Sequence, residues 1–499
     1  MMKKNLGFLF SPPALAALFS AAIMIYVLFL FPVGMADNGD YYRVINGNGL
    51  YKLDRGQVDE YFEYFSTDYG IYQYYNEYES SLISSQTLFI RTALTLDKLF
   101  TKNDSIFDIR FLSAIIGIWA VFDIYMLVNY ATRFLGNRNG YIAGALAVLI
   151  FADTGYTSYF NSFYAEGLVF VSFLGAAASA LLIFQNRSRP RALLAFYIFN
   201  SLTLITAKQQ NAPLGFLLGL LILPLIFHIF RQQPHKTKSL PIRKTVFAAS
   251  CSLLLCGCGV LVYFSIPQEF VDINKFHSMT RGITISSANP ETALDHFDIN
   301  PQYSLLDGAI YYERYPSVDV EGRELKTDFY PNYGFISVII YYIEHPEDFS
   351  LLLNRAAKVA YIIRPDEMGN YLRSAGKSPG QKTSFFALHS WLKRRIAPQT
   401  VGFICFWIAI VLGLNFENKK QMMVLGCAIT LGLAQIVVSI IGAGDADLAK
   451  HIFLYNVAFD LTNYILVSTV FLKWIDRRRE KSISATPATL SKSEEESIA

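Results

Sequence analysis

The stretch FYAEGLVFVSFLGAAASALLIF, residues 163–184, decides the fold class of this chain. After Glu166 it contains only apolar and small residues and two serines, over about the 20 positions that a helix needs to cross a membrane. The whole chain of 499 residues is 53% hydrophobic and only 17% charged, which is too apolar for a set of soluble domains. We therefore expect an all-α polytopic membrane protein.

Apolar runs of this kind recur along the chain and predict about ten transmembrane helices. The first run is longer than the apolar core of a signal peptide, so we expect an uncleaved membrane anchor. The runs are residues 14–31, 107–130, 141–154, 163–184, 192–205, 214–230, 246–265, 401–414, 422–441 and 457–474.

Basic residues occur in every second connection between these runs. They cluster at residues 133–138, 187–191, 231–244, 419–420 and 477–479. Lys and Arg near span ends stay on the cytoplasmic side, so the alternation predicts that both termini are cytoplasmic and that the number of spans is even. The other connections, including the two long polar ones, are then extracytoplasmic.

These connections suggest the domain organisation. We expect an N-terminal transmembrane module (1–265) with a first extracytoplasmic loop (36–106), an extracytoplasmic insertion (266–400), C-terminal transmembrane helices (401–475) and a disordered cytoplasmic tail (476–499). Within the first loop, residues 85–100 predict an interfacial helix with Phe89, Ala93 and Phe100 on one stripe.

Two carboxylates follow the first span directly. Asp37 and Asp40 lie three residues apart in the sequence ADNGD, with Gly39 permitting a tight turn and Arg43 close behind. The pair could hold an acceptor hydroxyl or a metal ion, and partial burial would tune one carboxylate as a general base. Equally, Asp37 could cap a turn or a helix.

Other candidate residues lie at the predicted external ends of later spans. Glu166 is an acid near membrane depth, where such a group usually has a partner. Lys208 precedes three amides that begin with Gln209, and a lysine there could bind a phosphate or simply extend its amine to the membrane surface.

The last external turn, GDADLAKH at residues 444–451, carries both charge signs. Asp447 and His451 lie one helical turn apart beside Lys450, a pattern that suits metal or phosphate binding as well as a cap with a salt bridge. Lys275, His277 and Arg281, at the start of the second insertion, add positive charge on the same side.

The sequence lacks the features that are typical of several classes of protein function. The net charge of +3 is too small for a nucleic-acid binder of this size, and the sequence has no Walker loop, HExxH helix or Gly-x-Ser-x-Gly elbow. All five cysteines lie in apolar runs, which indicates packing rather than a disulfide framework.

Four short motifs resemble those of the GT-C superfamily of membrane glycosyltransferases, and more narrowly bacterial hexosyltransferases of surface-layer and cell-wall glycan synthesis. They are ADNGD (36–40), YAE (164–166), KQQN (208–211) and GDADLAKH (444–451), which occur in order along the ten predicted spans. The resemblance implies a GT-C-like fold, a bacterial cell membrane and transfer of a hexose from a polyprenyl-phosphate donor to a glycan acceptor on the outer face.

The resemblance also implies roles for single residues. Asp40 or Asp37 is the base that deprotonates the acceptor, and the spacing of the two leaves open which one. Glu166 is the second acid. Residues that bind the donor phosphate or the substrate are Arg43, Lys208, Gln209, Asp447, Lys450 and His451.

Metal dependence varies within the family, so Mg²⁺ or Mn²⁺ held by Asp37, Asp40 and Glu166 stays an open alternative. Two other functions also stay open: a transporter or flippase of lipid-linked saccharides, and a glycan polymerase. A transporter typically shows internal repeats and broken helices in matching positions, and the sequence has no such symmetry. The second insertion, rich in aromatic residues, is expected to bind the acceptor glycan.

Overall fold

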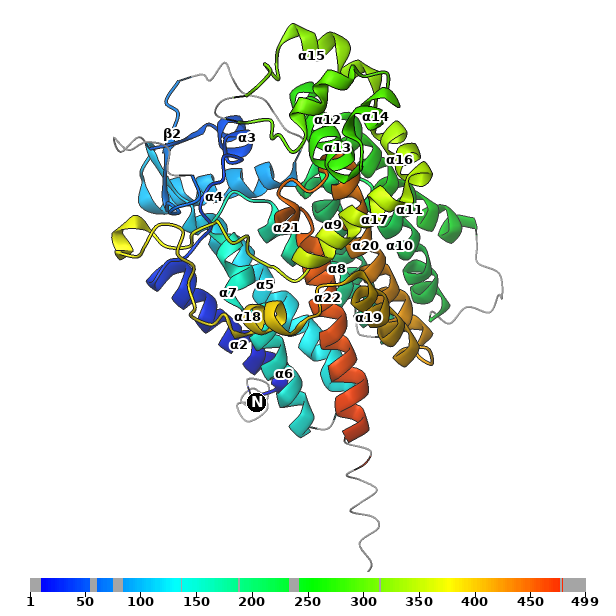
Figure 1. Cartoon of the computed structure of the whole chain (residues 1–499). Helices are drawn as coiled ribbons and strands as arrows, with labels where there is room; N and C mark the ends of the chain where they lie inside the picture. Colours follow the sequence, from blue (N-terminus) through cyan, green and yellow to red (C-terminus); the bar gives the residue numbers. More distant parts are fainter. Residues whose placement is uncertain are drawn as a thin grey trace, which may run out of the picture.

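The structure is a computed structural model of the chain, and it describes residues 10–53, 61–74, 84–135, 137–186, 189–232, 242–313 and 316–475, together with Arg478. Long helices run side by side through the lower part of the molecule, and shorter helices and a small sheet lie over their upper ends (Figure 1). The predicted tail at 476–499 lies outside the described residues except for Arg478.

Seven helical segments of the described chain are long and apolar enough to cross a membrane. The apolar stretch at residues 163–184 contains α8 (Glu166–Phe184), whose whole apolar window is buried among other helices. The other six segments are α2 (Pro12–Ile25) with the π-helix η1 (Tyr26–Leu30), α5 (Arg110–Ala131) with η3 (Thr132–Phe134), α9 (Pro190–Ala207), α10 (Leu214–Arg231), α11 (Ile242–Phe264) and α20 (Lys419–Ala443). The predicted polytopic helical architecture is thus confirmed.

Two further candidate spans are bent pairs. α6 (Asn137–Phe151) meets α7 (Thr154–Thr157) and η4 (Ser158–Phe160) at 40°, and α18 (Leu388–Ile396) meets α19 (Val401–Leu414) at 113°. The first bend has a local cause, because the Asp153 carboxylate accepts the backbone N–H of Gly155 at 2.7 Å and starts a new helix.

Length and composition therefore identify seven to nine candidate spans within the described residues, whereas the sequence predicted about ten. The difference is the last run, which forms α22 (Phe453–Leu466) and the π-helix η10 (Val467–Phe471). This segment contains Asn456 and Asp460 and is less apolar than the others.

Asp460 shows why a carboxylate is tolerated there. It is 1% exposed and accepts hydrogen bonds from Lys393 Nζ at 2.8 Å, His389 Nε2 at 2.9 Å and the Tyr156 hydroxyl. Lys393 and His389 belong to α18, so this buried ion pair fastens the crossing helix α18 to the bundle. A buried charge is found in such a place only when it is paired in this way.

The start of α2, the end of the last described helix and the connection between α5 and α6 lie at one end of the bundle. The Tyr141 hydroxyl at the start of α6 donates to Phe10 O at 2.8 Å, and Asn139 Nδ2 donates to Leu472 O at 3.1 Å. Arg133, between α5 and α6, donates to the Gln185 carbonyl at the end of α8. The even number of spans and the assignment of this end to the cytoplasm both stay predictions.

The first insertion contains the small sheet, which the all-α prediction did not include. β1 (Leu50–Lys52), β2 (Asp68–Ile71) and β3 (Ile106–Asp108) pair antiparallel in the order β1-β2-β3. Ahead of the sheet lie α3 (Tyr42–Ile45) and the 3-10 turn η2 (Asn46–Asn48). These short elements follow η1 directly, so they bring the ADNGD motif to the upper end of the bundle.

The helix predicted at residues 85–100 is present as α4 (Ser85–Thr101), and its position at a membrane interface stays a prediction. Its N-cap is Ser84, whose hydroxyl oxygen accepts the backbone N–H of Gln86 at 3.1 Å. Phe89 and Ala93 are buried as expected, but Phe100 is 72% exposed, because the buried stripe continues through Asp97 rather than through Phe100.

The second insertion consists of short helices that cover the upper end of the bundle (Figure 1). It is joined to the first insertion through the backbone: Val33 pairs with Tyr371, Phe65 pairs with Leu372, and Gly34 N–H donates to Asn370 O at 3.0 Å. Its elements at that end are α12 (Gln268–His277), η6 (Ser278–Ile283), α13 (Thr284–Ser286), α14 (Pro290–Asp295), η7 (Pro301–Leu306), α15 (Arg323–Asp328), η8 (Tyr330–Asn332), α16 (Phe335–Glu344), α17 (Pro346–Val359) and η9 (Arg373–Ala375). The last helix of the insertion, α18, lies against α6 of the bundle instead.

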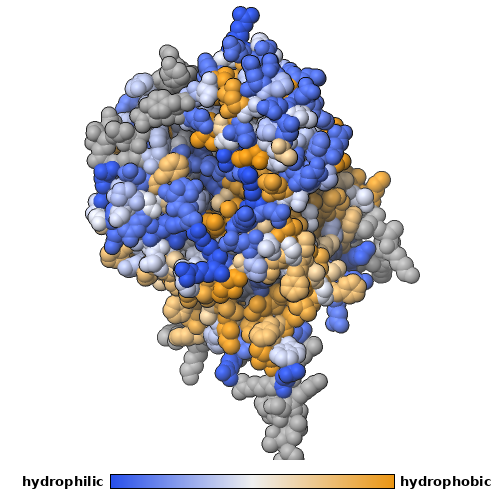
Figure 2. Space-filling model, in the orientation of Figure 1, coloured by the Kyte–Doolittle hydropathy of each residue, from blue (hydrophilic) through white to orange (hydrophobic). Residues whose placement is uncertain are grey.

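The surface has the polarity of a membrane protein with one large polar end. Figure 2 shows hydrophilic residues over most of the upper part of the visible face and a broad hydrophobic zone over the long helices below. A hydrophobic zone of this extent on an outer surface is typical of contact with lipid.

Candidate functional site

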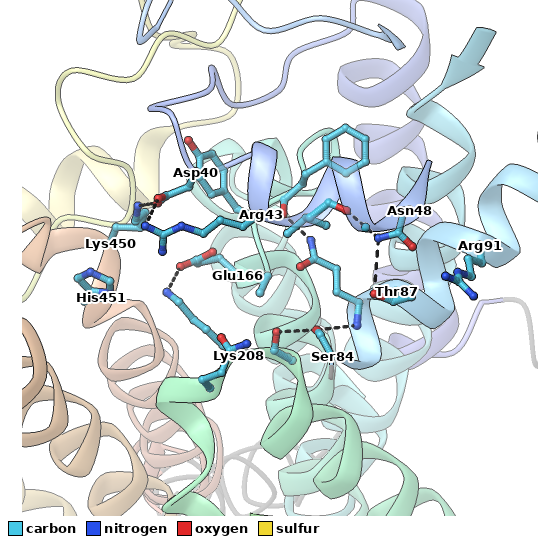
Figure 3. Close-up of a pocket in the computed structure, with 18 residues that line it drawn as sticks. Asp40, Arg43, Asn48, Ser84, Thr87, Arg91, Glu166, Lys208, Lys450 and His451 are labelled. Atoms are coloured by element: carbon cyan, nitrogen blue, oxygen red, sulfur yellow. Dashed lines mark hydrogen bonds and ion pairs between the residues drawn. The ribbon is translucent and has the colours of Figure 1, made fainter. Parts of the chain in front are cut away.

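A pocket of about 130 Å³ lies where the first insertion meets the upper ends of α8 and α9 and the turn before α22 (Figure 3). Among the residues predicted from sequence, seven line it: Asp40, Arg43, Glu166, Lys208, Gln209, Lys450 and His451. Asp37 and Asp447 are outside its lining. Side chains from four distant segments thus meet in one place, and their chemical roles stay predictions.

Asp37 has a structural position. Its buried carboxylate accepts the backbone N–H groups of Gly39 at 2.8 Å and Tyr41 at 3.2 Å and forms an ion pair with Lys52 Nζ at 3.0 Å. Gly39 has a φ of 104°, a backbone conformation that residues other than glycine rarely adopt. The structure therefore agrees with the turn-capping alternative for Asp37, since its oxygens are already bonded by the loop itself.

Asp40 points into the pocket. Its carboxylate contacts Lys450 Nζ, and its other oxygen lies 3.3 Å from Arg43 Nη2. Burial alone would raise the pKa of Asp40, but the positive charges of Lys450 and Arg43 hold it well below its usual value. Asp40 is therefore an ionised carboxylate that is already paired with two cations.

Tyr164 fixes the Asp40 loop to the bundle. Its hydroxyl donates to the Ala36 carbonyl at 3.0 Å and accepts the Asn38 backbone N–H at 2.8 Å. Because Tyr164 precedes α8 by two residues, the first insertion is aligned with the most buried helix of the bundle. The predicted YAE motif thus supplies a positioning residue as well as an acid.

Glu166 and Lys208 form the second ion pair of the pocket. Glu166 is the first residue of α8 and is 2% exposed, and its Oε1 lies 2.6 Å from Lys208 Nζ. A carboxylate at a helix N-terminus is favoured by the helix dipole. The lysine comes from the extended residue between α9 and η5 (Gln209–Asn211), so this pair also holds two spans together.

Lys450 belongs to α21 (Leu448–His451), the short helix in the last external turn. It is 4% exposed and lies 5.5 Å from the centre of the Tyr164 ring, so it is a buried cation over an aromatic face. Burial alone would lower the pKa of Lys450, but Asp40 and Asp447 raise it above its usual value. Lys450 is thus a permanent positive charge.

His451 was predicted to be one of the residues that bind the donor phosphate or the substrate, and that role stays a prediction. Burial, together with the positive charges of Lys208 and Lys450, holds the pKa of His451 well below its usual value. Its Nδ1 lies 3.3 Å from the Gln210 side-chain oxygen. His451 is therefore neutral, and it can donate one hydrogen bond but contributes no charge to anion binding.

Comparison with known proteins gives the family. The family model described as the YfdI N-terminal transmembrane domain matches residues 1–488. The chain belongs to this YfdI family. A curated relative, "Uncharacterized protein YfdI" of Escherichia coli, is 24% identical over 454 residues, which cover 87% of this chain and 87% of the relative.

Solved structures similar to this YfdI-family chain include the oligosaccharyltransferase AglB of Archaeoglobus fulgidus in complex with an inhibitory peptide and a dolichol-phosphate. The identity is 12% and the TM-score 0.39, with 96% of this chain and 52% of that chain covered. The apo form of the Archaeoglobus fulgidus oligosaccharyltransferase is similar at a TM-score of 0.38 and 12% identity, with 94% and 52% covered. The YfdI-family chain spans about half the length of these structures.

In this YfdI-family protein, the pocket lining contains two acids, Asp40 and Glu166, and four cations, Arg43, Arg91, Lys208 and Lys450. Each predicted acid has a cationic partner: Asp40 pairs with Lys450 and Arg43, Glu166 with Lys208, Asp37 with Lys52 and Asp447 with Lys450. An anion that enters must therefore compete with carboxylates for the same cations.

The same pairing bears on the metal alternative. Across the described ranges, no group of three His, Cys, Asp or Glu side chains is arranged to hold a metal ion. Asp37, Asp40 and Glu166 each contact a lysine instead. The three residues proposed as metal ligands do not form a metal site in this arrangement.

The second insertion holds the last external turn of this YfdI-family chain in place. Asp445 lies 2.7 Å from Arg281 Nη2 and 2.5 Å from Arg355 Nη1, and its backbone N–H donates to the Arg281 carbonyl at 2.9 Å. Gly444, with φ of 60°, permits the close approach: a Cβ on it would lie 2.1 Å from the Arg281 oxygen. This clamp fixes the turn that carries Lys450.

Some residues of the clamp and of the pocket gave no usable signal in the sequence. Arg355 lies in an ordinary amphipathic helix, and only its pairing with Asp445 reveals its position. Asn48 and Thr87 also line the pocket, but single amide and hydroxyl residues in a polar loop carry no pattern. A covarying Arg355–Asp445 pair among homologues is the signal that would have identified the clamp.

Proposed function

We propose that this chain is a membrane glycosyltransferase that transfers a hexose from a polyprenyl-phosphate donor to a cell-surface glycan or lipid-linked acceptor, with Asp40 as the base. The observation that carries the proposal is the contact of Asp40 with Lys450 and Arg43 in a pocket that also contains Lys208. A carboxylate beside permanent cations, at the end of a transmembrane bundle, suits a reaction in which a lipid phosphate leaves and a hydroxyl loses its proton.

The donor phosphate would bind by exchanging partners with the carboxylates. Lys450 and Arg43 now neutralise Asp40, and Lys208 neutralises Glu166. A phosphate that takes over Lys450 and Arg43 removes the charges that lower the pKa of Asp40, so the pKa rises toward the range that a general base needs. Donor binding and activation of the base are then the same event.

The transfer step is balanced without a further reactant. The acceptor oxygen forms a bond to the anomeric carbon of the hexose, and the bond between that carbon and the phosphate oxygen breaks. The acceptor proton moves to the Asp40 carboxylate, and the polyprenyl phosphate leaves with the bonding electron pair. Lys450, Lys208 and Arg43 stabilise the negative charge that develops on the leaving phosphate.

The proposal is tested with purified protein in lipid nanodiscs, polyprenyl-phosphate hexoses and detection of released polyprenyl phosphate. Asp40→Asn keeps the shape of the side chain but cannot accept the proton, so we expect transfer to fall by at least about 100-fold, the usual contribution of a general base. Asp104→Asn is the matched control, because Asp104 lies in the same insertion and its side chain is 78% exposed.

Full activity of the Asp40→Asn protein would contradict the role of Asp40 as base. Wild-type protein that binds the lipid-linked hexose but releases no polyprenyl phosphate with any acceptor would contradict the transferase proposal. That second outcome would favour the transporter alternative, which needs binding without bond cleavage.

A further inference from the structure

The pocket has two chemically different ends. Lys208, Lys450 and His451 lie on one side of it, whereas Asn48 and Thr87 lie on the other, between η2 and the first turn of α4 (Figure 3). The first end holds the ion pairs described above. The second end offers an amide and a hydroxyl that neither the sequence motifs nor the proposed transfer step uses.

Asn48 presents an unused acceptor. Its Nδ2 donates to the Val44 carbonyl at 2.8 Å and lies 3.5 Å from Thr87 Oγ1. Within the described part of the chain, its Oδ1 is buried and has no hydrogen-bond partner. Rotating the amide by 180° would place Oδ1 against the Val44 carbonyl oxygen, so the orientation is fixed. A buried, unsatisfied amide oxygen is costly and is rare unless a ligand or water completes it.

The unused acceptor selects the chemistry of its partner. A phosphate at neutral pH presents mainly acceptor oxygens, which Asn48 Oδ1 would repel, whereas a sugar hydroxyl can donate to it. Thr87 Oγ1 faces the Asn48 Nδ2 donor, so the Thr87 hydroxyl proton is available to a second ligand oxygen. Arg43 Nε, buried and without a hydrogen-bond partner in the described chain, adds a donor between the two ends.

We propose that Asn48 and Thr87 form the subsite that recognises hydroxyl groups of the donor's sugar ring and so determines which hexose is transferred. This inference rests on the proposed function, since it places the phosphate of the same donor at the end with Lys208 and Lys450. Pairing a buried acceptor with a substrate hydroxyl discriminates strongly against a sugar that lacks or inverts that hydroxyl, because the acceptor is then left unpaired.

The test compares three lipid-linked hexoses that differ only in the sugar with the sugar-free lipid phosphate. Wild type, Thr87→Val and Asn48→Ser are assayed in nanodiscs with polyprenyl-phosphate glucose, mannose and galactose, and their binding of sugar-free polyprenyl phosphate is measured separately. Loss of one hydrogen bond raises KM for the preferred hexose by about fivefold, and we expect the kcat/KM ratio between hexoses to move toward one. Affinity for sugar-free polyprenyl phosphate stays unchanged.

Thr92→Val is the matched control, because Thr92 lies on the exposed face of the same helix and its hydroxyl donates to the Leu88 carbonyl at 2.8 Å. Thermal unfolding of each variant shows whether it folds.

The subsite is overturned if both variants keep the hexose preference of the wild type, or if they weaken the sugar-free lipid equally. If the wild type neither binds nor cleaves any lipid-linked hexose, the proposed function and the subsite fail together. If the wild type is active and selective but the variants do not alter its selectivity, only the subsite fails.

Discussion

His277 gives the sharpest test of how the second insertion is held over the pocket. It is the last residue of α12, and its Nε2 accepts the backbone N–H of Tyr311 at 3.0 Å. This bond requires a neutral ring with its proton on Nδ1. Burial lowers the pKa of His277 to about 4, with Arg281 and Arg43 adding to the effect and Asp447 and Asp40 opposing it.

The sign of the pH effect follows from the two protonation equilibria. The unfolded chain binds the proton near pH 6.5, whereas the folded insertion resists it down to about pH 4. The stability contributed by neutral His277 is therefore fully present above pH 6.5 and is lost as the pH falls toward 4. The loss is about 1.4 kcal/mol per pH unit and about 3 kcal/mol at most.

The assay is hydrogen exchange of the α12 amides and of the Tyr311 amide at several pH values between 6.5 and 4, corrected for the pH dependence of intrinsic exchange. We expect wild-type protection to fall by up to about 300-fold over this range. In His277→Gln the side-chain oxygen can still accept the Tyr311 N–H but cannot be protonated. Its protection is expected to change much less with pH.

A matched control separates this histidine from the others in the insertion. His296→Gln changes an exposed ring that directly follows α14, leaves the bond between His277 and Tyr311 in place, and is expected to keep the pH dependence of the wild type. Carboxylates that titrate below pH 5 affect both proteins alike, so the difference between the His277→Gln and wild-type curves isolates His277. Parallel curves for these two proteins would refute the reasoning.

Three more predictions concern the buried ion pair of Asp460, the clamp on Asp445 and the orientation of the chain in the membrane. Lys393→Met removes a cationic partner of Asp460 and should destabilise the protein by about 3 kcal/mol. The double variant Lys393→Met, Asp460→Leu should lose less stability, because no unpaired charge stays buried. Thermal unfolding in detergent compares the two variants, and an equal or larger loss in the double variant would contradict the buried pair. Asp445→Asn weakens the clamp on the Lys450 turn and should raise KM for a lipid-linked hexose about tenfold, and unchanged KM would contradict it. Glu324→Cys, in a protein freed of its native cysteines, should react with an impermeant maleimide on intact cells, and reaction only after permeabilisation would reverse the orientation.

The sequence predicted the architecture well because the membrane limits the possible structures. A span must be a long apolar helix, so the apolar runs are visible in the sequence. For example, α8 lies within the apolar run at residues 163–184. The features that the sequence did not predict are those that the membrane does not constrain. The bend at Asp153 and the crossing of α18 are set by side-chain hydrogen bonds to distant residues, and the three short strands leave no periodic signal.

The candidate site was predictable only in part. Asp40, Glu166, Lys208 and Lys450 were chosen because each is a charged residue at the end of a span, and the predicted parity puts all four at one end of the bundle. Pair formation could not be foreseen, because an ion pair between residues 410 positions apart, such as Asp40 and Lys450, depends on helix packing.

The sequence alone thus determined that this is a membrane protein, the number of its spans to within one to three, and that the two long polar insertions lie at the same end of the bundle. These features depend on the transfer of side chains between water and lipid, which is local to each segment. Tertiary structure decided that Asp37 caps a turn while Asp40 faces the pocket, that His451 is neutral, and that Asn48 keeps an acceptor free. Those properties arise from distance and burial between segments, because electrostatic and hydrogen-bond energies depend on neighbours that only folding brings together.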